Sequence, residues 1–172
     1  MENQASATKT MLTYGLYLGI VSIIVSVANY SFGNIYKPHW SINIINYLLM
    51  IGFIALGLKA FKDQNGGYLK LAEAIKIGMG IALVAGILSL IYFLIFVKVI
   101  EPDFISKLGE VQEQMMYERF PDMDEAILEK QVEMSKKFMT PGVMSAFILG
   151  GSLFLGLIFS LIIGLIMKKT EE

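Results

Sequence analysis

Residues 101–141, with the sequence EPDFISKLGEVQEQMMYERFPDMDEAILEKQVEMSKKFMTP, form the only long polar stretch in a chain of 172 residues. It holds ten of the 15 acidic residues and five of the 14 basic residues. Outside it the chain consists mainly of long apolar runs, and 55% of all residues are hydrophobic. A soluble domain does not gather its apolar residues in this way. The polar segment is therefore expected to lie outside a membrane, with the apolar remainder as its anchor.

Four apolar runs, at residues 11–30, 42–61, 77–97 and 143–167, have the length of membrane-spanning helices. About 20 residues of α-helix cross ~30 Å of hydrocarbon. We therefore predict an all-α fold: a four-transmembrane-helix bundle, forming one integral membrane domain over residues 1–172, with an extramembrane amphipathic helical hairpin between helices 3 and 4. One alternative stays open for the first run, because Ser26-Val27-Ala28 has the small residues of a signal-peptide cleavage site.

Two helices are expected within the polar segment, at residues 104–120 and 123–139. Each follows a Pro-Asp pair, and Asp122 has the spacing to Glu125 of a capping box. Both have apolar residues at helical spacing on one face. These faces can pack on each other, lie on the bilayer or bind a partner helix, and the acidic charge disfavours anionic lipid. The candidate partner-binding residues are Phe104, Leu108, Val111, Met115, Ile127, Leu128, Met134 and Phe138.

Three of the apolar runs carry small residues four positions apart, a spacing that places them on one face of a helix. Such a face lets two helix backbones approach closely, so that dispersion and weak hydrogen bonds hold them together. The stripe in the fourth run can pack against one of the other two, or against the same face of a second copy. The candidate helix-packing residues are Gly15, Gly19, Gly78, Ala82, Gly86, Ser152, Gly156, Ser160 and Gly164.

Several classes of site are disfavoured by the residues present. The chain has no cysteine and one histidine, His39, without metal-ligating neighbours, so we expect no metal and no cofactor. Five methionines between Met115 and Met139 could bind Cu(I), but methionine more often fills irregular apolar faces. No basic face predicts nucleic-acid binding. No catalytic triad, zinc motif or intramembrane acid pair is recognisable, so we do not expect an enzyme.

The basic residues divide equally between the two sides of such a bundle, with seven on each side. Those on the side of the termini lie in much shorter segments, and dense positive charge next to a span marks the cytoplasmic side. We therefore expect both termini in the cytoplasm and residues 98–142 on the opposite side.

Three stretches carry a pattern known from a protein family: GLYLG at residues 15–19, NGG at 65–67 followed by LAEAIKIG at 71–78, and GLIFSLII at 156–163 before a Lys-Lys end. With these stretches and its polar insertion, the chain resembles the domain of unknown function 4199 family. The resemblance covers nearly the whole chain. It implies a four-helix inner-membrane protein of Gram-negative bacteria, which would make residues 98–142 periplasmic. It implies no activity and no catalytic residues.

We interpret the protein as an integral inner-membrane protein of unknown biochemical activity. It would be a non-enzymatic accessory or interaction protein that presents an acidic helical hairpin to an envelope protein partner. The lipid bilayer and a homo-oligomer are the other partners considered. The alternative is a small oligomeric transporter or channel lined by Asn43, Asn46 and Tyr47, although no Asp, Glu, Lys, Arg or His lies in the interior of any span, Lys59 falling near the end of the second.

Overall fold

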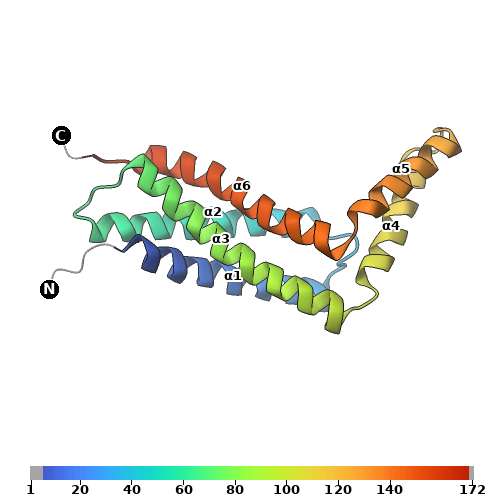
Figure 1. Ribbon diagram of the computed structural model, residues 1–172, viewed down its shortest axis with the longest axis horizontal. Helices are drawn as coiled ribbons and strands as arrows, with labels where there is room; N and C mark the ends of the chain where they lie inside the picture. Colours follow the sequence, from blue (N-terminus) through green and yellow to red (C-terminus); the bar gives the residue numbers. More distant parts are fainter. Residues whose placement is uncertain (1–5, 171–172) are drawn as a thin grey trace. The chain divides into compact units, whose positions relative to one another are not determined.

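The computed structural model describes residues 6–170, which contain six α-helices and no β-strand (Figure 1). A π-helical turn, Phe96–Ile100, extends the third helix. The predicted all-α fold is confirmed. The helices are α1 (Ala7–Phe32), α2 (Trp40–Gln64), α3 (Leu71–Ile95), α4 (Phe104–Arg119), α5 (Glu125–Phe138) and α6 (Pro141–Met167).

Four helical stretches are long and apolar enough to cross a membrane: α1, α2, α6, and α3 together with its π-helical turn, Leu71–Ile100. They contain 26, 25, 27 and 30 residues. At 1.5 Å per residue these lengths correspond to roughly 38–45 Å. Because the hydrocarbon layer is only ~30 Å thick, each helix can extend its ends into the headgroup region. Four such helices indicate a multi-pass membrane protein, as the apolar runs predicted.

The chain forms two compact units. The apolar unit contains residues 6–90 and 148–170, and the polar unit contains residues 91–147. The polar unit contains α4 and α5 together with the last residues of α3 and the first residues of α6, and all ten acidic residues of the polar segment belong to it.

The central helix of the apolar unit is α3. Its Ile77 and Ile81 are fully buried, as are Ile54 and Leu58 of α2. Many other large apolar side chains face outward instead, and Phe154 of α6 remains 64% exposed. An aqueous solvent would penalise that surface, whereas lipid chains are as apolar as these side chains. The apolar residues therefore cover both the interior and the outer surface of this unit.

Helix α1 is part of the apolar unit and continues unbroken through Ser26-Val27-Ala28. It packs on α3 through two glycines. A Cβ atom on Gly15 would lie 2.6 Å from the Cβ of Val84, and the next glycine of this face, Gly19, lies against Leu88.

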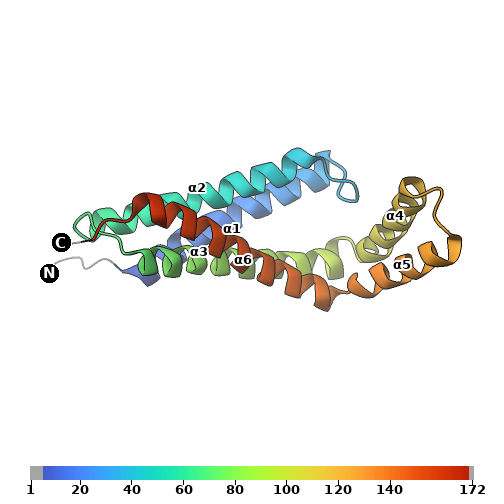
Figure 2. The ribbon, with the colours of Figure 1, turned by 90° about the horizontal axis from the view of Figure 1, so that it is seen from above.

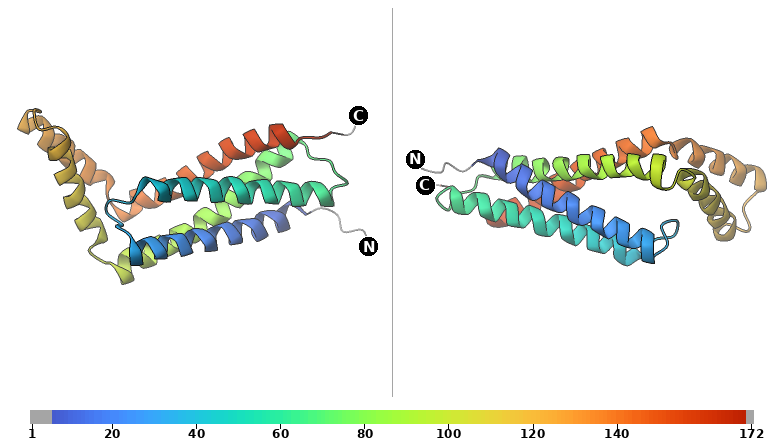
Figure 3. Two further views of the ribbon diagram at one scale, coloured as in Figure 1. Left: turned by 180° about the vertical axis from the view of Figure 1, so that it is seen from behind. Right: turned by 90° about the horizontal axis from the view of Figure 1, so that it is seen from below.

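The two ends of the apolar unit hold different parts of the chain. At one end, His39 caps α2: its Nδ1 atom lies 2.9 Å from the Ser41 hydroxyl and accepts a hydrogen bond from the Ser41 backbone N–H. The other end of the unit holds both the start of α1 and the end of α6, as Figures 2 and 3 show. The alternating direction of α1, α2 and α3 follows from the short connections between them.

In the polar unit, α5 begins at Glu125 and is capped by Asp124. The Asp124 carboxylate accepts hydrogen bonds from the backbone N–H groups of Ala126 at 3.0 Å and Ile127 at 3.3 Å. The predicted capping box at Asp122 is therefore wrong. Two aspartates lie two positions apart, and only the backbone path decides which carboxylate faces the free N–H groups of the first turn.

Candidate functional site

The small residues of α3 and α6 meet each other inside one chain. They pair in antiparallel order, so that each step of four residues along α3 matches a step of four back along α6. A Cβ atom on Gly156 would lie 2.5 Å from the Cβ of Ala82, and one on Gly164 would lie 2.7 Å from the Cβ of Ala74. The four pairs are Ala74–Gly164, Gly78–Ser160, Ala82–Gly156 and Gly86–Ser152.

The two hydroxyls on this interface are bonded within their own helix. Ser160, which is fully buried, donates to the backbone carbonyl of Leu157 at 3.1 Å, and Ser152 donates to that of Leu149 at 2.9 Å. Within residues 6–170 no buried side-chain nitrogen or oxygen lacks a hydrogen-bond partner. The stripe therefore serves close backbone packing, since its polar groups are already satisfied. Gly15 and Gly19 do not take part, because they pack against Val84 and Leu88 of α3.

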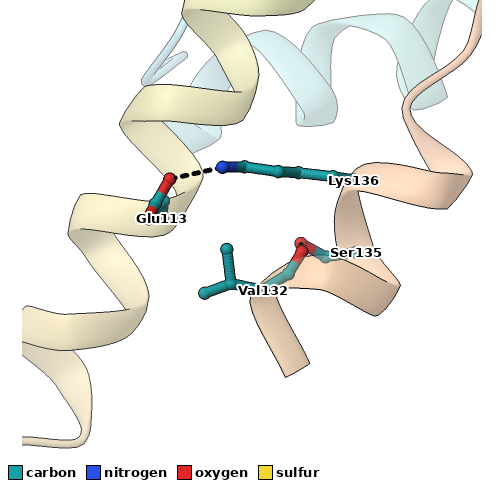
Figure 4. A network of polar contacts seen from close by, with 4 residues as sticks. All are labelled: Glu113, Val132, Ser135 and Lys136. Atoms are coloured by element: carbon teal, nitrogen blue, oxygen red, sulfur yellow. Dashed lines mark hydrogen bonds and ion pairs between the residues drawn. The ribbon is translucent and has the colours of Figure 1, made fainter. Parts of the chain in front are cut away.

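In the polar unit, α4 and α5 form a helical hairpin. An ion pair joins them, with Nζ of Lys136 2.6 Å from an Oε atom of Glu113, and Val132 points toward α4 below this pair (Figure 4). Leu128 and Val132 of α5 are only 3% and 5% exposed. These two apolar side chains, together with the ion pair, hold the hairpin closed.

The candidate partner-binding residues divide into three groups by exposure. Leu128 is buried and belongs to the interior of the hairpin, so it is not available to a partner. The side chains of Phe104, Leu108 and Val111 are half-buried, and the Phe104 ring packs edge-on against Phe96 with centroids 5.3 Å apart. Four side chains are exposed, with exposed fractions of 44% for Met115, 53% for Ile127, 55% for Met134 and 58% for Phe138.

Two exposed aromatic residues were missed by the sequence reasoning. Tyr117 and Phe120, near the tip of the hairpin, are 38% and 40% exposed. The Arg119 guanidinium lies 5.9 Å from the centroid of the Phe120 ring and shields part of it. Neither residue carried a signal, because adjacent positions such as Arg119 and Phe120 do not face each other on a helix and their contact cannot be read from residue order.

Comparison with protein families gives a match over residues 13–169 to the family described as protein of unknown function (DUF4199). The chain belongs to the DUF4199 family. The resemblance drawn from the three sequence stretches is thereby confirmed. Neither the curated proteins nor the solved structures gave a match.

For this DUF4199 chain, most acidic residues of the hairpin lie on exposed helix faces. The exposed ion pair of Lys137 and Glu133 is typical, because its side chains are 69% and 70% exposed at a separation of 2.9 Å. Within residues 6–170, no group of three or more His, Asp or Glu side chains is placed to hold a metal ion. The surface of the hairpin therefore consists of exposed apolar side chains surrounded by acidic residues.

Proposed function

We propose that the protein is a non-enzymatic accessory protein of the bacterial inner membrane, whose α4–α5 hairpin lies outside the bilayer and binds another envelope protein. The observation that carries the proposal is the exposure of Met115, Ile127, Met134 and Phe138 on an acidic hairpin. Large apolar side chains that stay exposed outside a bilayer are typical of a docking surface. We name these four residues the hairpin apolar face.

The charge of the hairpin supports its place outside the membrane. Its two helices carry ion pairs such as Lys136–Glu113 and Lys137–Glu133, whose side chains are between 36% and 70% exposed. Charges exposed to hydrocarbon cost several kcal/mol each, so these helices belong in water. The four apolar helices would then form a transmembrane bundle, with the termini cytoplasmic and residues 98–142 periplasmic, as the density of lysines near the spans favours.

Exposure of the carboxylates also supports a binding role in place of catalysis. Catalytic carboxylates usually lie in a pocket that shields them from water. Glu133 on α5 is instead solvated and paired with a lysine. Methionines, by contrast, suit an adaptable protein-binding surface because the thioether chain is flexible and polarizable.

The proposal is tested by changing the hairpin apolar face without removing the hairpin. We expect Ile127→Ser/Met134→Ser/Phe138→Ser to insert normally but to lose the partner that co-purifies with the full chain in mild detergent. Truncating anchors at an interface costs ~1–4 kcal/mol each, so three changes should weaken association at least about a hundredfold. The matched control is Glu129→Ser/Glu133→Ser, two exposed residues of α5 that point away from Ile127, Met134 and Phe138, and it should keep the partner.

Quantitative mass spectrometry of the three samples provides the readout, with deletion of residues 104–138 as the reference for complete loss. A partner retained equally by both variants would refute binding through this face. A full chain that purifies as a partner-free oligomer would refute the accessory role and favour the alternative.

That alternative is a small oligomeric transporter or channel. It is favoured by one feature of α2, where Asn43 and Tyr47 are exposed on the outer surface of the apolar unit and Asn46 is half-buried beside them. Polar side chains on the outside of a spanning helix can meet a second copy and line a path between copies. Vesicles reconstituted with the protein should then pass solute, and Asn43→Leu/Tyr47→Leu should abolish both flux and oligomerisation.

A further inference from the structure

At the end of the apolar unit that holds the start of α1 and the end of α6, the chain builds an ordered loop between α2 and α3. Two glycines in the left-handed region, Gly66 with φ +64° and Gly67 with φ +85°, turn the chain back after α2. Any other residue would be strained there. The Asn65 side-chain amide donates to the carbonyl of Tyr68 at 3.1 Å, which closes the loop before α3 begins.

The residues that follow α6 are clasped to this loop. The backbone N–H of Leu69 donates to the carbonyl of Lys169 at 2.9 Å, and the N–H of Lys169 donates to the carbonyl of Leu69 at 3.0 Å. Nζ of Lys62 also donates to the carbonyl of Met167 at 2.8 Å. Leu69 is fully buried, so the clasp is anchored in the core. The backbone that carries Lys168 and Lys169 is therefore held in place.

A depression of about 530 Å³ lies at this clasp, lined by Asn65, Tyr68, Lys70, Glu73, Lys169 and Thr170. The Lys169 ammonium lies 5.6 Å from the centroid of the Tyr68 ring, which attracts it and fixes its position. An Oε atom of Glu73 accepts the backbone N–H of Lys70 at 2.9 Å, so the one carboxylate of the lining is engaged with the start of α3. We name this depression the clasp pocket.

The lining of the clasp pocket carries two lysines and one glutamate, so its net charge is positive. Within residues 6–170, no carboxylate lies within 4.0 Å of the ammonium of Lys70 or Lys169. The same end of the apolar unit carries seven lysines, and Asp63 and Glu73 are its only acids within the described chain. The lysines of this end are Lys9, Lys59, Lys62, Lys70, Lys76, Lys168 and Lys169.

The position of the clasp pocket also indicates which class of ligand it can bind. It lies where α2 and α6 end and α3 begins, so in a membrane it falls at the level of the lipid headgroups. Ammonium groups bind phosphate as point charges, and the Tyr68 hydroxyl can donate a hydrogen bond to a phosphate oxygen. A volume of about 530 Å³ lies within the range of small-molecule sites.

We propose that the clasp pocket binds the phosphate group of an anionic ligand, which at this depth is the phosphodiester of an acidic phospholipid. Lys70 and Lys169 supply the charge, Tyr68 holds the Lys169 ammonium, and the backbone clasp keeps the two lysines together. The site is separate from the hairpin apolar face, and its test is independent of whether the hairpin binds a partner.

The test titrates short-chain phosphatidylglycerol into the full chain in a non-ionic detergent and measures bound lipid by native mass spectrometry. We expect Lys70→Gln/Lys169→Gln to bind about 25-fold more weakly, because each lysine near a phosphate contributes a factor of roughly five. The matched control, Lys59→Gln/Lys76→Gln, removes two exposed lysines of the same end outside the pocket and should lose less than about twofold.

Further arms separate the possible outcomes. Lys70→Arg/Lys169→Arg should retain binding, and equal melting temperatures of the lipid-free proteins would show that the glutamine variant is folded. Phosphatidylcholine should bind weakly, and displacement of the lipid by millimolar inorganic phosphate would assign the site to free phosphate. Equal losses in the pocket and control variants, or equal binding of the two lipids, would overturn the proposal, since general charge attraction would then explain the lysines.

Discussion

The contact between Ala82 and Gly156 makes the stability of the apolar unit sensitive to a single methyl group. In Gly156→Ala, the new Cβ atom would lie 2.5 Å from the Cβ of Ala82. Carbon atoms rest at ~3.5–4.0 Å from each other, so α3 and α6 must separate by about 1 Å at this point. The separation loosens the neighbouring pairs as well, because both helices are rigid over these four turns.

The cost can be set against a control on the same helix. Overpacking a tight contact by one methyl group costs ~1–3 kcal/mol. Gly150 has no atom within 4 Å of its Cβ position, so Gly150→Ala meets open space. That control should be neutral or more stable by up to ~1 kcal/mol, since alanine favours the helix over glycine. The two alanine variants should therefore differ by at least ~1 kcal/mol.

Thermal unfolding in detergent, followed by circular dichroism, measures the difference. For a chain of this size, ~1–3 kcal/mol corresponds to a melting temperature roughly 2–12 °C lower. The decisive variant is the exchange Ala82→Gly/Gly156→Ala, which places one methyl group at the contact as in the native chain and should recover most of the loss. Equal melting temperatures for Gly156→Ala and Gly150→Ala, or no recovery in the exchange variant, would refute the pairing of α3 with α6.

Two further predictions concern the hairpin. Asp124→Ala should destabilise α5 by ~1 kcal/mol and speed amide exchange in its first turn, whereas the stability of Asp122→Ala should stay within ~0.5 kcal/mol of the native protein. A larger loss of stability in Asp122→Ala than in Asp124→Ala would instead support the capping box at Asp122. Leu128→Ala, at a side chain only 3% exposed, should cost ~2–4 kcal/mol and increase exchange throughout α4 and α5. Met134→Gln, at 55% exposure, should leave exchange unchanged, and equal effects of these two changes would contradict the assigned interior of the hairpin.

The helices and their order followed from local features of the chain. Apolar runs of membrane-spanning length predict spans because the backbone can satisfy its own hydrogen bonds in lipid only as a helix or a closed barrel. Thus α4 begins at Phe104 as predicted, and the four apolar runs all fall within helices. Family membership also came from linear stretches, since it depends on residue order and needs no contact.

Contacts between residues far apart in the sequence could not be predicted from these local features. Nothing in the order of residues distinguishes Leu128, which is buried, from Ile127 next to it, which is 53% exposed. Both suit an amphipathic helix, and the difference arises from the direction in which α5 meets α4. The clasp of Leu69 with Lys169 likewise joins residues 100 positions apart through backbone groups that every residue carries.

By itself, the sequence determined that this is an all-helical chain with four spans, one acidic insertion and two exceptional kinds of surface, small-residue stripes and dense lysines. Those properties are set by side-chain volume, polarity and helical period, which act locally. Only the tertiary structure decided that the stripe of α6 packs on α3 of the same chain, that α1 packs on α3 through other residues, and that Lys70 and Lys169 share one pocket. The physical reason is that lipid does not drive apolar faces together, so the partner of each face is chosen by the fit of opposing surfaces.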